Sequence, residues 1–151
     1  MSTKKILWID DDINRFALMP YVDEFQDRGY DIDKVENPDE INNILEQNPI
    51  PDGIIVDLCM PMGIIVDVSM PTGKNIGYGE AKGGLQTGFV VLKRLMANPQ
   101  LNNVKKIIFT IVDNPEVRRY CEENGIEYLE KRNFLSDTFV NKVEEIISKK
   151  E

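Results

Sequence analysis

The sequence predicts an α/β fold, a doubly wound five-stranded parallel sheet covered by helices on both faces. Five short apolar runs alternate with about five longer segments of helical periodicity. The run from Gly53 to Val56 lacks polar alternation, as a strand buried on both faces does, and strand–helix alternation is typical of a parallel sheet. The 151 residues are 42% hydrophobic, which is enough for one domain with a core. We therefore expect residues 1–151 to form a single domain.

The first half of the chain supplies three strands and two helices. The predicted strands are Lys5 to Ile9, Tyr30 to Val35 and Gly53 to Val56. A helix is expected within Asn14 to Arg28, and Pro20 inside it predicts a kink or a late start. The second helix is predicted to start at Asn37-Pro38, a capping residue followed by proline in the first turn, and to end before Pro49.

The second half supplies two strands and three helices. The predicted strands are Lys106 to Thr110 and Ile126 to Leu129. The predicted helices are Thr87 to Met96, Asn114 to Gly125, and Ser136 to Lys149. Asparagine followed by proline is a typical helix start, and glycine is a typical stop.

A ten-residue repeat interrupts this pattern. Residues 53–62 (GIIVDLCMPM) and 63–72 (GIIVDVSMPT) begin with the same pentapeptide, and a glycine-rich loop follows at 73–88. We interpret the repeat as a duplication of one strand and its loop. Both copies compete for one central strand, so their flanks must decide between them. We expect the first copy to enter the sheet, because use of the second would lengthen the preceding connection by ten residues. The second copy stays the alternative.

Composition restricts the classes of function. The net charge of −8 disfavours direct binding of nucleic acid. No apolar run could span a bilayer and the N-terminus does not read as a signal peptide, so we expect no membrane contact and a cytoplasmic location. The cysteines Cys59 and Cys121 lack metal-type spacing and are expected to be reduced. The chain has no histidine, which leaves carboxylates as its main chemical resource.

Polar residues follow four of the predicted strands. In strand order they are Asp10 with Asp11, then Asp57 or Asp67, then Thr110, then Lys131. In a doubly wound sheet these strand ends converge on one crevice. Three carboxylates repel one another, a hard divalent cation relieves the repulsion, and oxygen ligands favour Mg²⁺. We therefore expect Asp10, Asp11 and Asp57 to bind Mg²⁺.

The same crevice is suited to phosphoryl transfer. A phosphoryl donor adds negative charge, which Mg²⁺ and Lys131 can neutralise. The central aspartate is then the nucleophile, Asp57 if the first copy forms the strand and Asp67 if the second does. Thr110 is placed to donate a hydrogen bond to a phosphoryl oxygen.

Four segments in this order resemble the receiver domains of two-component response regulators. They are Ile6-Leu-Trp-Ile-Asp-Asp-Asp12, Ile54-Ile-Val-Asp-Leu-Cys-Met-Pro61, Ile107-Ile-Phe-Thr110 and Tyr128-Leu-Glu-Lys131. The resemblance covers nearly the whole chain and implies a flavodoxin-like receiver fold. It also implies Mg²⁺ at Asp10 and Asp11, phosphorylation of the aspartate before Met-Pro, phosphoryl sensing by Thr110 and Lys131, and a switching role for Tyr128.

The resemblance implies a phosphoacceptor signalling module or phosphorelay component. The donor would be a sensor histidine kinase or a phosphotransfer protein, and the signal would pass to a downstream protein partner. Catalysis would be at most self-phosphorylation and self-dephosphorylation. We expect the last strand and the final helix to form the partner surface, either for another protein or for a second copy in a homodimer.

Two other functions stay open. Ile111 replaces a residue that is usually small in receiver domains, and Arg132 replaces the usual proline. With the duplication and the long loop, these departures favour a degenerate receiver that binds a partner without phosphorylation. The other alternative is an Mg²⁺-dependent aspartyl-phosphate phosphatase. Such enzymes carry an Asp-x-Asp pair, but here Asp57 and Asp67 are followed by Leu-Cys and Val-Ser.

Overall fold

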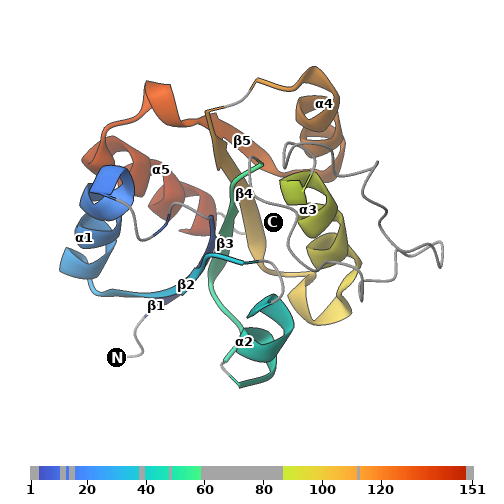
Figure 1. The fold of residues 1–151 in the computed structure, drawn as a ribbon, viewed down its shortest axis with the longest axis horizontal. Coiled ribbons are helices and arrows are strands. Elements are labelled where there is room, and N and C mark those ends of the chain that lie inside the picture. Colours follow the sequence, from blue (N-terminus) through green and yellow to red (C-terminus); the bar gives the residue numbers. More distant parts are fainter. Residues whose placement is uncertain are drawn as a thin grey trace.

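The computed structural model describes residues 4–10, 13, 16–37, 40–47, 49–58, 87–111 and 113–148, to which every structural statement below refers. They include a five-stranded parallel sheet of order β2-β1-β3-β4-β5 (Figure 1). The strands are β1 (Lys4–Ile9), β2 (Tyr30–Val35), β3 (Gly53–Val56), β4 (Lys105–Thr110) and β5 (Glu127–Glu130). Each lies within one residue of its predicted bounds. The predicted α/β fold with a doubly wound parallel sheet is confirmed.

The helices begin and end close to the predicted positions. They are α1 (Met19–Asp27), α2 (Ile41–Gln47), α3 (Thr87–Ala97), α4 (Pro115–Asn124) and α5 (Ser136–Ser148). Pro20 lies in the first turn of α1, so the late start was the correct alternative. α2 begins later than predicted, because Glu40 N donates to the carbonyl of Asn37 at 3.0 Å in a turn that precedes it. The side chain of Asn114 caps α4, and Gly125 ends it in a left-handed conformation with φ 69°.

The two faces of the sheet bury alternate strand residues. α1 and α5 cover one face, while α2, α3 and α4 cover the other (Figure 1). The face under α1 and α5 contains Ile6, Trp8, Ile55, Ile107 and Phe109. The opposite face contains Leu7, Ile9, Ile54, Val56 and Ile108. Because β1, β3 and β4 point apolar residues to both faces, these three strands show no polar alternation in the sequence, whereas the edge strand β2 does alternate.

Aromatic side chains fill the layer between the sheet and its α1/α5 cover. Phe139 of α5 stacks on Phe109 of β4 with 3.7 Å between ring centroids. Its ring also meets Trp8 and Phe25, with centroid separations of 5.7 and 6.0 Å. α5 therefore uses its apolar face to complete the core.

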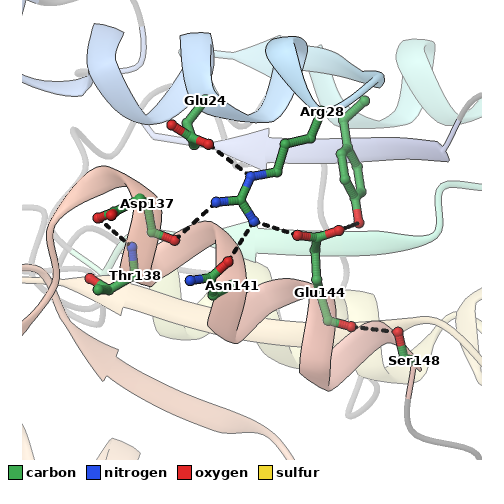
Figure 2. A network of polar contacts seen from close by, with 8 residues as sticks. Glu24, Arg28, Asp137, Thr138, Asn141, Glu144 and Ser148 are labelled. Carbon is green, nitrogen blue, oxygen red and sulfur yellow. Dashed lines mark hydrogen bonds and ion pairs between the residues drawn. The ribbon is translucent and has the colours of Figure 1, made fainter.

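A polar network joins α1 to α5 across the outside of this layer (Figure 2). Arg28 follows α1 and donates through Nε to Glu24 at 2.8 Å. Its Nη1 donates to Asn141 at 2.6 Å and to Glu144 at 2.5 Å, both on α5. Hydrogen bonds to Glu24 and Glu144 raise the pKa of the Arg28 guanidinium. The network therefore bridges the two helices with a permanently charged group.

The first copy of the repeat forms the central strand β3, as predicted. Residues 59–86 lie outside the described part of the chain, and with them the second copy, Asp67 and most of the 73–88 loop. Asp11 and Cys59 also lie outside it, while Cys121 is a free, buried cysteine. Among the described residues, no helix is long and apolar enough to cross a membrane.

Candidate functional site at the carboxyl edge of the sheet

Two buried carboxylates lie where the strand order reverses. Asp10 follows β1 and Asp57 follows β3, and these strands are neighbours in the sheet. The backbone continues the ladder for one more residue on each, since Asp10 N donates to Val35 O and Asp57 N donates to Ile9 O, both at 2.9 Å. The two residues are 0% and 2% exposed. The apolar strands thus hold both side chains at the switch point of the fold, where doubly wound sheets bind ligands.

Lys131 brings a cation to this pair. It begins a short 3₁₀ turn directly after β5, and its Nζ donates to Asp10 Oδ2 at 2.9 Å and to Asp57 Oδ2 at 3.5 Å. Burial acts to lower the pKa of Lys131, but attraction to Asp10 and Asp57 and its hydrogen bonds with both outweigh burial and raise the pKa. Lys131 is therefore held in its charged form between the two carboxylates.

The donor set of this cluster fits Mg²⁺. Two carboxylates and one ammonium group leave one excess negative charge in a buried place (−2 + 1 = −1). The carboxylates offer oxygen ligands, which Mg²⁺ prefers over nitrogen and sulfur. Asp10 and Asp57 are the described residues that would hold the ion. Asp11, the third expected ligand, lies outside the described residues.

Thr110 is the last residue of β4 and reaches the same edge of the sheet. It is fully buried and is paired in register with Glu130, the residue before Lys131. The next residue, Ile111, is 64% exposed. The structure therefore places Thr110 at the strand end beside Lys131, and leaves the bulky Ile111 open to solvent.

Tyr128 connects β5 to the beginning of α4. Its half-buried hydroxyl accepts a hydrogen bond from Asn114 N at 3.2 Å. The guanidinium of Arg118 lies 4.3 Å from the centroid of its ring. Burial raises the pKa of the Tyr128 hydroxyl, while the hydrogen bond from Asn114 acts in the opposite direction. Tyr128 thus contacts the residue that caps α4, and its role as a switch stays a prediction.

Gly88 is a site residue that the sequence reasoning did not identify. It lies in the first turn of α3, and its N donates to Leu58 O at 3.2 Å. A Cβ on Gly88 would lie 2.1 Å from Asp57 O and 2.4 Å from Leu58 Cα. Only glycine lets α3 come this close to the backbone of Asp57. A glycine inside a predicted helix was the available signal, since it usually has a packing reason.

The comparisons with known proteins identify the fold. No family model matches the sequence, and no curated protein matches it. Among solved structures, a CheY-like response regulator receiver domain protein from Methanospirillum hungatei JF-1 superimposes with a TM-score of 0.68 and 19% identity, covering 97% of this chain and 94% of that one. Chemotaxis protein CheY4 of Vibrio cholerae gives a TM-score of 0.67 and 20% identity, covering 96% and 99%.

A response regulator from Thermotoga maritima is similar to the same extent. It gives a TM-score of 0.67 and 15% identity, covering 98% of this chain and 100% of that one. The similarity thus spans both chains almost completely, although the identities are low. The receiver fold that the four sequence segments implied is confirmed: this chain has the fold of response regulator receiver domains.

Proposed function

We propose that this chain is a phosphoacceptor signalling module of a two-component system and that Asp57 accepts the phosphoryl group. The contact of Lys131 with the buried carboxylates of Asp10 and Asp57 carries the proposal. These three side chains together provide a nucleophile, a fixed cation and an all-oxygen donor set at the switch point of a receiver fold. A buried, electrostatically organised site of this kind favours the charge that develops in phosphoryl transfer.

The chemistry needs little from the protein besides position and charge. A carboxylate oxygen of Asp57 attacks the phosphorus of the donor, and the bond from phosphorus to the leaving group breaks with its electron pair. With an acyl phosphate donor, a carboxylate leaves and no proton is transferred. Lys131 neutralises the phosphoryl oxygens and Thr110 donates a hydrogen bond to one of them. Bound Mg²⁺, held by Asp10, Asp57 and by Asp11 from the sequence, would supply further positive charge.

The phosphoryl donor in this proposal is a sensor histidine kinase or a phosphotransfer protein in the cytoplasm. The output passes to a downstream protein partner. The apolar face of α5 does not provide the partner surface, because Phe139, Val140 and Val143 are fully buried against the sheet. A partner surface or homodimer at β5 and α5 would therefore use the polar side of that helix, and it stays a prediction.

Incubation with acetyl phosphate and Mg²⁺ is expected to phosphorylate Asp57. Mass spectrometry of the intact protein should show one added phosphoryl group, and peptide mapping should place it in the fragment that contains residues 53–58. Asp57→Asn should lose the label, while Asp52→Asn, at the other end of β3, should keep it. Label that persists in Asp57→Asn and disappears in Asp67→Asn would move the acceptor to the second copy. Absence of any label would favour the degenerate receiver.

Mg²⁺ is expected to bind weakly, because an ion with few protein ligands keeps several waters. Isothermal calorimetry of the wild-type chain measures the affinity directly. Asp10→Asn should reduce it about tenfold by removing one ligand charge. Asp31→Asn is the matched control, since Asp31 is an exposed carboxylate in β2 that contacts Lys5. Equal affinity in both variants would contradict the assignment of the ligands.

A further inference from the structure

The structure offers an explanation for the choice between the two copies of the repeat. Positions 53–57 and 63–67 have the same residues, so the buried core of β3 cannot distinguish them. The copies differ at the residue that precedes the pentapeptide, which is Asp52 in one and Met62 in the other. They differ again just after it, where Leu58 corresponds to Val68. Any preference for the first copy must come from such flanking positions and from the lengths of the connections.

Asp52 makes two hydrogen bonds to the same residue of β1. Its N donates to Lys5 O at 2.8 Å, and its carboxylate Oδ2 accepts from Lys5 N at 2.7 Å. The first residue pair of the β1–β3 ladder, Ile6 with Gly53, follows directly. Any residue can provide the first of these bonds through its backbone. The second needs a side-chain acceptor, which methionine does not have.

We propose that Asp52 selects which copy of the repeat enters the sheet. Its carboxylate holds Lys5 N at the beginning of β3 and so favours the strand that has Asp52 immediately before it. Leu58 acts in the same direction, because it is fully buried and valine in its place would fill less of the core. The selection also decides whether Asp57 or Asp67 accepts the phosphoryl group, and this second statement rests on the proposed function.

The contact is separate from the ion pairs around it. The ammonium of Lys5 lies 3.8 Å from Asp31 and 3.5 Å from Asp33, both on the opposite neighbour β2. The Asp52 carboxylate instead binds the backbone of Lys5. A variant can therefore remove a carboxylate near Lys5 and still keep the bond between Asp52 and Lys5 N. Asp31→Met is the matched control, because it makes the same chemical change on the other side of β1.

The test replaces Asp52 by methionine, so that both copies are preceded by the same dipeptide, Pro-Met. Hydrogen exchange with mass spectrometry compares the protection of fragments 53–58 and 63–68. The two fragments differ in mass, because one ends in leucine and the other in valine. Phosphorylation by acetyl phosphate gives a second readout as the ratio of label on Asp67 to label on Asp57. In Asp52→Met we expect protection to shift toward 63–68 and the label ratio to rise roughly tenfold, the change that corresponds to losing one hydrogen bond to a charged acceptor.

Two further variants complete the test. Asp52→Asn keeps an acceptor oxygen and should stay close to wild type. Asp52→Met combined with Met62→Asp moves the carboxylate to the second copy, and it should raise the label ratio beyond that of the single variant. It also decides the matter if Asp52→Met alone does not fold, as judged by circular dichroism.

The proposal is overturned if Asp52→Met and the double variant keep the wild-type protection pattern, or if Asp31→Met changes it as much as Asp52→Met does. Failure of the proposed function looks different. In that case the wild-type chain takes no label on either aspartate, while hydrogen exchange still reports which copy is in the sheet.

Discussion

Replacement of Lys131 by methionine should lower the free energy of unfolding by about 3 kcal/mol in the absence of Mg²⁺. The side chains of Asp10 and Asp57 are 0% and 4% exposed, and the change removes the ammonium group that contacts both. Methionine has a similar volume, so lost charge rather than a cavity causes the effect. Urea unfolding followed by circular dichroism measures it. Added Mg²⁺ should recover part of the loss, because the same two carboxylates would hold the ion.

The contribution of Lys131 to the free energy of unfolding should also depend on pH. The pKa of Lys131 is raised above the 10.5 of the unfolded chain. Its contribution to stability is therefore fully present below pH 10.5 and is lost as the pH rises through the folded-state pKa. The difference between wild type and variant should shrink as the pH rises above the folded-state pKa of Lys131. Lys142→Met is the control, because its ion pair with Glu145 is exposed and worth about 0.5 kcal/mol or less. Equal losses in the two variants would contradict the buried cluster.

Gly88→Ala is expected to destabilise the fold by about 2 kcal/mol or more, although alanine is the better helix former. Glycine to alanine in an ordinary helical position stabilises by up to about 1 kcal/mol, so the sign of the change is diagnostic. Here the added methyl group would lie 2.1 Å from a backbone atom, Asp57 O, which cannot move aside as a side chain can. α3 and the end of β3 must separate, and this displaces Asp57.

Two measurements test the Gly88 contact. Thermal unfolding measures the stability. The initial rate of labelling by acetyl phosphate depends on the position of Asp57, and we expect this rate to fall about tenfold or more. Gly53→Ala is the matched control in β3. Its Cβ would lie 3.0 Å from Cδ1 of Ile147, the far end of a flexible side chain, so its cost should be smaller. A stability gain in Gly88→Ala would show that α3 does not approach β3 this closely.

The strand ends of the candidate site could be predicted because their positions depend on local patterns. Each apolar run ends at a polar residue, and parallel strands bring their ends to one edge. Asp10, Asp57 and Thr110 therefore lie where the sequence placed them, and Lys131 contacts the two carboxylates. Asp11 and Asp67 lie outside the described residues. The functional roles of all these residues stay predictions.

Contacts that depend on packing angles and on distant side chains could not be predicted. The approach of Gly88 to Asp57 is set by how α3 packs on β3 after a long connection. The bond from Asp52 to Lys5 joins residues 47 positions apart, and no propensity or periodicity points to it. The delayed start of α2 has a more local cause, since a turn at Glu40 uses the carbonyl of Asn37 before the helix begins.

The network around Arg28 has a consequence for how the chain reaches its native state. Arg28 joins Asn141 and Glu144 over separations of 113 and 116 residues (Figure 2). During synthesis, β1 and α1 leave the ribosome long before α5, so Trp8 and Phe25 have no Phe139 to cover them. Closing so long a loop is slow, and exposed aromatic surface makes a nascent chain prone to aggregate. The first helix to be made is thus among the last to be completed, because its partner residues Asn141 and Glu144 lie in the last helix of the described chain.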